Sequence, residues 1–241
     1  MLSSERAARL AALVDERSPL SRLSRAQGMC ALCEETTGAT GVALSVAEDR
    51  LRHVTSTVCG TDAVSMRLEE LQLGLAEGPI ADALDTTFPV LAPDLTDGPH
   101  ARWLWFGPAA ARAGVGALFV LPLCVGETCL GALSLYRSTC GDLTAEEFDD
   151  FAALADAATD ILLGESAGGG DRAAGAWTVG EGTGFQPEIH QAVGVIMGDL
   201  QVDADGALAR LRAHAYAGDR SISEVAHEIV ARRLRLESDA A

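Results

Sequence analysis

Apolar residues recur along most of the chain at spacings that predict a mixture of helices and strands. Helical spacing is found at residues 1–37, with an interruption at Ser18-Pro19, and again at 62–75, 79–84 and 144–163. Strand-like runs are found at residues 41–46, 51–58, 89–92, 117–125 and 128–136. The residues Ala47-Glu48-Asp49-Arg50 suit a hairpin between the first two strands, and a loop at 93–99 leads into the segment 100–114.

The last two strands carry the clearest turn signal in the chain. Gly126-Glu127 separates ALFVLPLCV from TCLGALSLY, and Gly at the first central position of a two-residue loop fits a type II′ turn. This turn pairs Val125 with Thr128 and Cys124 with Cys129. A T-x-x-E capping box, Thr144 with Glu147, then begins the long helix 144–163.

The sequence pattern of the C-terminal region predicts three short amphipathic helices, which follow a segment of different composition. Residues 164–184 hold eight glycines and little periodicity, which is typical of a flexible linker. Pro187 then suits the first helical position, Asp203 caps a second helix, Gly218 is its expected C′ residue, and Ser221 with Glu224 opens a third. Because each helix is too short to be stable alone, we expect them to share one core.

Composition limits the class of protein. The 241 residues are 48% apolar, with no Lys, 18 Arg and 35 acidic residues, so the formal net charge is -17. Such a charge repels DNA, RNA and anionic membranes at long range, so any RNA contact must be local, and we expect no DNA or membrane partner. Residues 1–14 show no apolar run that would serve as a secretory or membrane address, which predicts a cytoplasmic protein.

The order of elements is α+β, with a mainly antiparallel sheet flanked by helices and a C-terminal three-helix unit. Residues 20–163 resemble a GAF domain of the actinobacterial type through LEELQLGLAEGPIADAL, FPVLAPDL, RWLWFGPAAARAGVGALFVLPL and LGALSLYR. Residues 185–236 resemble an ANTAR domain, the three-helix RNA-binding module of transcription antitermination regulators. The expected organisation is an N-terminal helical segment (1–19), a GAF sensory domain (20–163), a Gly-rich linker (164–184), an ANTAR domain (185–236) and a tail (237–241).

The ANTAR resemblance implies a homodimer that binds paired RNA stem-loops in leader transcripts and so prevents a terminator from forming. The predicted RNA-binding residues lie on the first helix and on or just after the second: His190, Gln191, Gly194, Arg210, Arg212, His214 and Arg220. Guanidinium groups can fork onto phosphates or stack on unpaired bases. Many ANTAR sequences carry Lys where this chain has Val193, and residues 185–241 hold six Arg against nine acids. We therefore expect weak, loop-directed binding that depends on dimer formation.

The GAF resemblance implies a sensory or dimerisation module, with the helix 144–163 as the expected dimer contact. An unidentified small molecule is its expected ligand, with no other cofactor. The predicted ligand-binding residues are His100, Arg102, Trp103, Trp105 and Phe106. The alternative is that these aromatic side chains simply cover one face of the sheet.

Six cysteines in a cytoplasmic chain predict reduced thiols, with no structural disulfide framework. Cys30 and Cys33 form half of a zinc motif, but no second pair completes four ligands, so no metal site is expected. The turn at Gly126-Glu127 places Cys124 and Cys129 directly opposite each other, so a reversible bridge that reports redox state is a further hypothesis.

The common catalytic and nucleotide-binding motifs are missing, so the chain is not expected to be an enzyme. Some GAF-fold proteins reduce methionine sulfoxide through cysteines, but the cysteines of this chain lie mostly in apolar strands or helices. Two regulatory alternatives stay open beside antitermination. One is a GAF sensor whose three-helix tail binds another protein, and the other is a thiol-based redox sensor.

Overall fold

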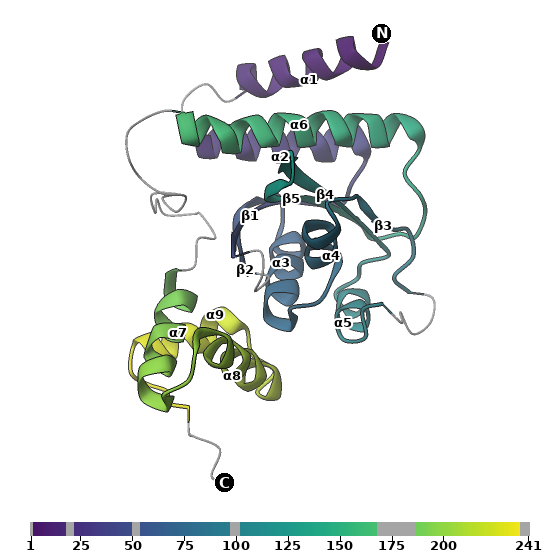
Figure 1. The fold of residues 1–241 in the computed structure, drawn as a ribbon. Helices are drawn as coiled ribbons and strands as arrows, with labels where there is room; N and C mark the ends of the chain where they lie inside the picture. Colours follow the sequence, from purple (N-terminus) through teal and green to yellow (C-terminus); the bar gives the residue numbers. More distant parts are fainter. Residues whose placement is uncertain (1, 18–21, 50–53, 97–101, 168–186, 237–241) are drawn as a thin grey trace.

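The computed structural model describes residues 2–17, 22–49, 54–96, 102–167 and 187–236. Five strands form one sheet, helices cover its two faces, and three C-terminal helices form a separate unit beside it (Figure 1). The helices are α1 (Leu2–Arg17), α2 (Arg22–Thr37), α3 (Ala63–Leu75), α4 (Pro79–Thr86), α5 (Phe106–Arg112), α6 (Ala145–Ala167), α7 (Pro187–Leu200), α8 (Ala204–Ala217) and α9 (Ile222–Val230). The strands are β1 (Gly41–Asp49), β2 (Val54–Gly60), β3 (Val90–Ala92), β4 (Ala117–Val125) and β5 (Thr128–Arg137).

The sheet has the order β2-β1-β5-β4-β3, and every neighbouring pair is antiparallel. The predicted α+β class with a mainly antiparallel sheet is therefore confirmed. Strands β1 and β5 approach closely at Gly131, where an added Cβ atom would lie 2.0 Å from the carbonyl oxygen of Ser45. A side chain at Gly131 would force these two central strands apart.

Two apolar cores lie on opposite faces of the sheet. The first core joins α1, α2 and α6 to one face, with Phe119, Phe151 and Leu154 fully buried. The second core joins α3, α4 and α5 to the other face, around Leu84, Phe106 and Leu118. In Figure 1, α6 and α2 lie side by side over the sheet, and α1 covers the outer side of α6. Helix α3 therefore has one side on the sheet and is open to a further partner on the other.

Several local signals in the sequence are confirmed by the backbone. Thr144 and Glu147 cap each other reciprocally at the start of α6, with N···O distances of 2.7 and 3.2 Å. Gly126 has a φ of 60°, whereas Glu127 is not among the residues with positive φ, as the type II′ turn requires. The register pairs Cys124 with Cys129 and Val125 with Thr128 as predicted.

Three predicted boundaries were wrong in detail. Strand β1 continues through residues 47–49, which were assigned to the hairpin loop, because a register shift lets Ala47 and Asp49 pair with β2. Helix α6 ends at Ala167, beyond the expected end at Leu163, while the rest of the predicted linker lies outside the described residues. Gly218 closes α8 with a φ of -90°, and Asp219, with a φ of 48°, takes the left-handed conformation expected of a C′ residue.

The three C-terminal helices share a core, as their length requires. Ala192, Leu208, Leu211, Val225 and Ala226 are among its buried members. The same core includes Val54 of β2 and Leu73 of α3, which are 5% and 4% exposed. The apolar core of the three-helix unit is thus continuous with the outer side of α3. In the part of the chain that the structure describes, no helix is long and apolar enough to cross a bilayer.

Candidate functional site

The three-helix unit is held against the sheet domain by polar contacts as well as by its core. Arg212 on α8 donates from Nε to the main-chain carbonyl oxygen of Leu73 at the end of α3, at 3.0 Å. His190 on α7 pairs through Nε2 with a carboxylate oxygen of Glu48 on β1. The rings of Trp105 and Tyr216 meet edge to face, with centroids 5.5 Å apart. We call this set of contacts the domain junction.

The junction changes the ionisation of the groups that form it. Burial tends to raise the pKa of Glu48, but hydrogen bonds from His190 and Ser56 outweigh this effect and lower it. Burial lowers the pKa of Arg212, whose Nε atom bonds to the Leu73 carbonyl oxygen at 3.0 Å. Helix α3 ends at Leu75, so the Leu73 carbonyl is one of the last-turn acceptors that a cation stabilises.

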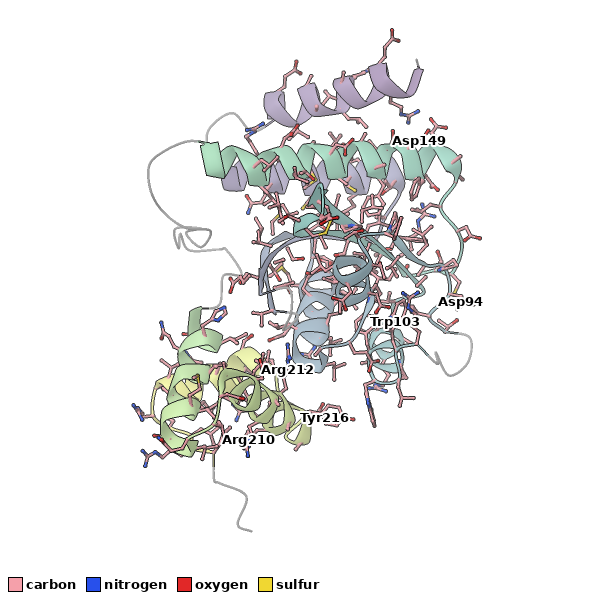
Figure 2. The ribbon with its side chains drawn as sticks, in the orientation of Figure 1. Asp94, Trp103, Asp149, Arg210, Arg212 and Tyr216 are labelled. Carbon is pink, nitrogen blue, oxygen red and sulfur yellow. A yellow bond between two sulfur atoms is a disulfide. The ribbon has the colours of Figure 1, made fainter. Side chains whose placement is uncertain are left out.

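The predicted RNA-binding residues fall into two groups. His190, Arg212 and Arg220 lie at the junction or border it, and Arg220 also pairs with Glu228 at 2.9 Å. Arg210 precedes Arg212 by two positions, about 200° around the helix, so the two side chains leave α8 on opposite sides (Figure 2). His214 shares the Arg210 side, and Gln191 and Gly194 are exposed on α7. The structure therefore does not bring all seven residues onto one face.

The predicted ligand-binding residues are also divided. Trp103 and Phe106 are 5% and 0% exposed and belong to the core above α3 and α4. Trp103 donates from Nε1 to Asp82 at 2.8 Å, and Arg102 pairs with the same carboxylate at 2.6 Å while lying over the Trp103 ring. Trp105 instead points outward and is 53% exposed. His100 lies outside the described residues.

Sequence reasoning missed the partners that the sheet domain supplies to the junction. Glu48 is 142 positions from His190 along the chain, and Leu73 acts through its main chain, so no local pattern identifies either. Tyr216 did carry a signal. Along the sequence it falls outside the apolar stripe of Ala207, Leu208, Leu211 and Ala215, so its large aromatic side chain does not belong to the core of the unit. In the structure Tyr216 is 57% exposed.

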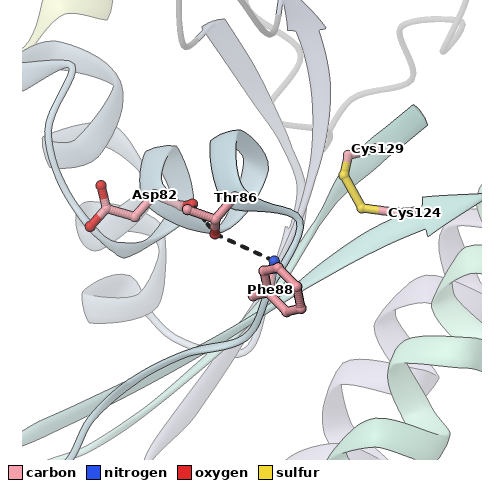
Figure 3. The surroundings of a disulfide bond; sticks show 5 residues. All are labelled: Asp82, Thr86, Phe88, Cys124 and Cys129. Atoms are coloured by element: carbon pink, nitrogen blue, oxygen red, sulfur yellow. Dashed lines mark hydrogen bonds between the residues drawn. A yellow bond between two sulfur atoms is a disulfide. The ribbon is translucent and has the colours of Figure 1, made fainter. Parts of the chain in front are cut away.

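The cysteines differ from the expectation of six free thiols. Cys124 and Cys129 form a disulfide across the β4–β5 hairpin, near the end of α4 where Thr86 and Phe88 lie (Figure 3). Their Cα atoms are 3.8 Å apart, because the two-residue turn places them directly opposite. Cys30, Cys33, Cys59 and Cys140 are free, and Cys140 is exposed. A 3.0 Å hydrogen bond between the Sγ atoms of Cys30 and Cys59, together with burial, raises the pKa of Cys30.

Family models match both parts of the chain. A GAF domain model matches residues 21–161, and an ANTAR domain model matches residues 186–230. The chain is a GAF and ANTAR domain-containing protein. Its sheet domain is the GAF domain, and α7, α8 and α9 form the ANTAR domain. ANTAR domains are RNA-binding antitermination domains.

Solved structures show the same GAF fold at low sequence identity. A GAF domain of a phosphoenolpyruvate-protein phosphotransferase from Coxiella burnetii has a TM-score of 0.52 at 13% identity, covering 68% of this chain and 96% of that one. Free methionine-R-sulfoxide reductase from Neisseria meningitidis, in complex with its substrate, has a TM-score of 0.50 at 13% identity, covering 69% and 91%. At these identities the likeness concerns the fold alone. Comparison with curated proteins gives no match.

Proposed function

We propose that this protein is a signal-responsive RNA-binding regulator that acts by transcription antitermination in the cytoplasm. As a homodimer it binds paired stem-loops in leader transcripts through its ANTAR domains, and the binding prevents a terminator from forming. The GAF domain controls this binding. The observation that carries the proposal is the domain junction, where GAF residues engage Arg212 and His190 of the ANTAR domain.

The junction supports control by docking. A guanidinium group that is half-buried, with its Nε atom bonded to the Leu73 carbonyl, offers fewer N–H donors and less of its plane to a phosphate or a base. In the docked arrangement RNA meets the Arg210 and His214 side of α8 together with Gln191 and Gly194 of α7, within a protein of net charge -17. Undocking exposes Arg212 and releases His190, which is already half exposed, from Glu48. A signal that weakens docking therefore raises RNA affinity, by as much as the two states differ in free energy.

The first test removes Arg210, which lies outside the junction. We expect Arg210→Ala to weaken binding of a labelled pair of leader-type hairpins about tenfold at low salt, and to reduce the slope of log affinity against log salt by about one. Arg9→Ala on α1 is the matched control, because it removes the same charge far from the ANTAR domain. Equal affinities for all three proteins, or no binding at low salt, would contradict the proposal.

The disulfide favours thiol chemistry as a second candidate function. Two-electron reduction of Cys124–Cys129 by an external dithiol, which gives up two protons and becomes a disulfide itself, leaves two thiols in the β4–β5 hairpin. Loss of the cross-link permits β4 and β5 to separate at that end. On the basis of this disulfide we propose that the protein also senses redox state. In this role it acts as a regulator and not as an enzyme. A methionine sulfoxide turnover assay tests the last point directly, since sustained turnover would show catalysis.

Alkylation followed by mass spectrometry tests the disulfide. In the native protein we expect Cys140 to react with iodoacetamide at once, because it is exposed and free. Cys124 and Cys129 should become labelled only after treatment with dithiothreitol. If both react without a reductant, the bridge is absent in solution and the redox proposal fails.

A further inference from the structure

A cleft of about 330 Å³ lies between the GAF and ANTAR domains, beside the junction contacts. Its GAF walls are α3 and the segment 104–112, and its ANTAR walls are α8, the turn after it and the start of α9. A volume of this size falls within the range of small-molecule sites, which often form between domains. Neither domain encloses the cleft alone, so any occupant contacts both.

Two aromatic rings line the cleft and are not buried by the protein. Trp105 of the GAF domain and Tyr216 of the ANTAR domain are 53% and 57% exposed, and they touch edge to face. Trp105 is held in place because Glu77 accepts hydrogen bonds from the backbone N–H groups of Trp105 and Phe106, at 2.9 and 3.1 Å. Rings that are about half exposed offer apolar surface on which a planar group can stack.

The charges around the cleft oppose the charge of the whole protein. Four arginines line it, namely Arg67, Arg112, Arg212 and Arg220, against the carboxylates of Glu70 and Asp219. Arg67 and Arg220 are paired with nearby glutamates, and Arg212 bonds to Leu73. Arg112, in the last turn of α5, is exposed and has no ion-pair partner within the described part of the chain. A guanidinium group so placed suits an anionic group of a ligand.

We propose that this cleft binds a free nucleotide that bridges the two domains. The base stacks on the Trp105 ring and meets the Tyr216 ring at its edge, and Arg112 receives the phosphate. Glu70 and Asp219 line the same cleft and can accept hydrogen bonds from the amino or ribose hydroxyl groups. The same chemistry is offered by an unpaired nucleotide of an RNA loop. The free molecule fits better, because the cleft exists only while the domains are docked and is bounded on both sides.

Calorimetric titration of the full-length protein with AMP, GMP, CMP and UMP separately tests the site without RNA. We expect saturable binding of at least one nucleotide with a Kd below about 1 mM, and weaker binding of its nucleoside and of inorganic phosphate alone. Trp105→Ala and Arg112→Ala should each weaken binding about tenfold, while Trp105→Phe retains most of it. Phe88→Ala and Arg235→Ala remove an exposed ring and an exposed guanidinium elsewhere, so binding should be unchanged.

Three outcomes would overturn the proposal. The first is no saturable binding of any of the four nucleotides, and the second is binding that Trp105→Ala leaves intact in a protein whose urea unfolding is normal. The third is that hairpin RNA, but not the free nucleotides, loses affinity in Trp105→Ala, which assigns the cleft to an RNA loop.

A further experiment rests on the proposed function. A nucleotide that holds the domains together should lower hairpin affinity, and failure of this experiment alone would refute the coupling while leaving the site.

Discussion

Glu69→Gln should stabilise this protein by about 3 kcal/mol at pH 8 and by only about 1 kcal/mol at pH 5.5. Glu69 lies on α3 and is 2% exposed between the helix and the sheet. Its Oε1 atom accepts a hydrogen bond from Ser134 at 2.6 Å, while Oε2 has no partner among the described residues. A buried carboxylate with one unsatisfied oxygen is costly, and the neutral amide of Gln removes that cost.

The pH dependence follows from the direction of the pKa shift. Burial raises the pKa of Glu69 from 4.5 to about 7, although hydroxyl groups of Ser134 and Ser45 partly oppose the rise. The folded protein therefore binds a proton that the unfolded chain has released between these two values. The contribution of Glu69 to the free energy of unfolding is therefore fully present below pH 4.5. It falls as the pH rises, and the loss levels off above about pH 7.

Urea unfolding from pH 5.5 to pH 8.5 measures the difference between wild type and variant. Other groups titrate in both proteins and cancel in the difference, so the curve reports Glu69 alone. Glu16→Gln replaces an exposed carboxyl group on α1 and should change the free energy of unfolding by less than about 0.5 kcal/mol. A difference between wild type and Glu69→Gln that does not vary with pH would show that Glu69 titrates normally.

The fold was largely predictable because its signals are local. The two-residue turn at Gly126-Glu127 specifies both register and facing residues, and the capping pair Thr144–Glu147 needs only three residues of sequence. Errors arose where pairing overrode local pattern. Ala47 and Asp49 look like a loop, yet they extend β1 because β2 offers partners across a register shift. Such shifts depend on the neighbouring strand and leave no trace in the residues themselves.

The candidate site was less predictable, because it joins residues that lie far apart in the sequence. The side chains of Arg210 and Arg212 have the same chemistry, and only the position of α3 makes one of them, Arg212, a junction residue. Trp103, Trp105 and Phe106 form one aromatic run, but two of them complete a core while the third faces the ANTAR domain. Residue type indicated that these positions matter. It could not assign them to core, junction or cleft, since that depends on contacts far apart in the chain.

Opening the junction from its GAF side should raise hairpin affinity about thirtyfold, within the usual range of coupling free energies between sites. Gly74→Trp does this without any substitution in the ANTAR domain. An added Cβ atom at Gly74 would lie 4.0 Å from a methyl group of Ile222, so a methyl group fits there, whereas an indole extends over Ile222 and into the cleft that Gly74 also lines. We expect this bulk to separate α3 from α9 and to release Arg212 and His190. Gly74→Ala is the matched control and should leave affinity unchanged. Fluorescence anisotropy of a labelled hairpin pair measures both.

Arg212→Ala distinguishes release of the RNA-binding residues from a general loosening of the protein. In the wild-type background its two effects oppose each other, because loss of the Leu73 contact favours undocking while loss of the guanidinium removes an RNA contact. In the Gly74→Trp background only the second effect is left, so affinity should fall about tenfold. This difference between backgrounds is a double-mutant cycle across the junction. If Arg212→Ala has the same effect in both backgrounds, docking does not control access to Arg212. If Gly74→Trp leaves affinity unchanged, the docked arrangement does not restrain RNA binding.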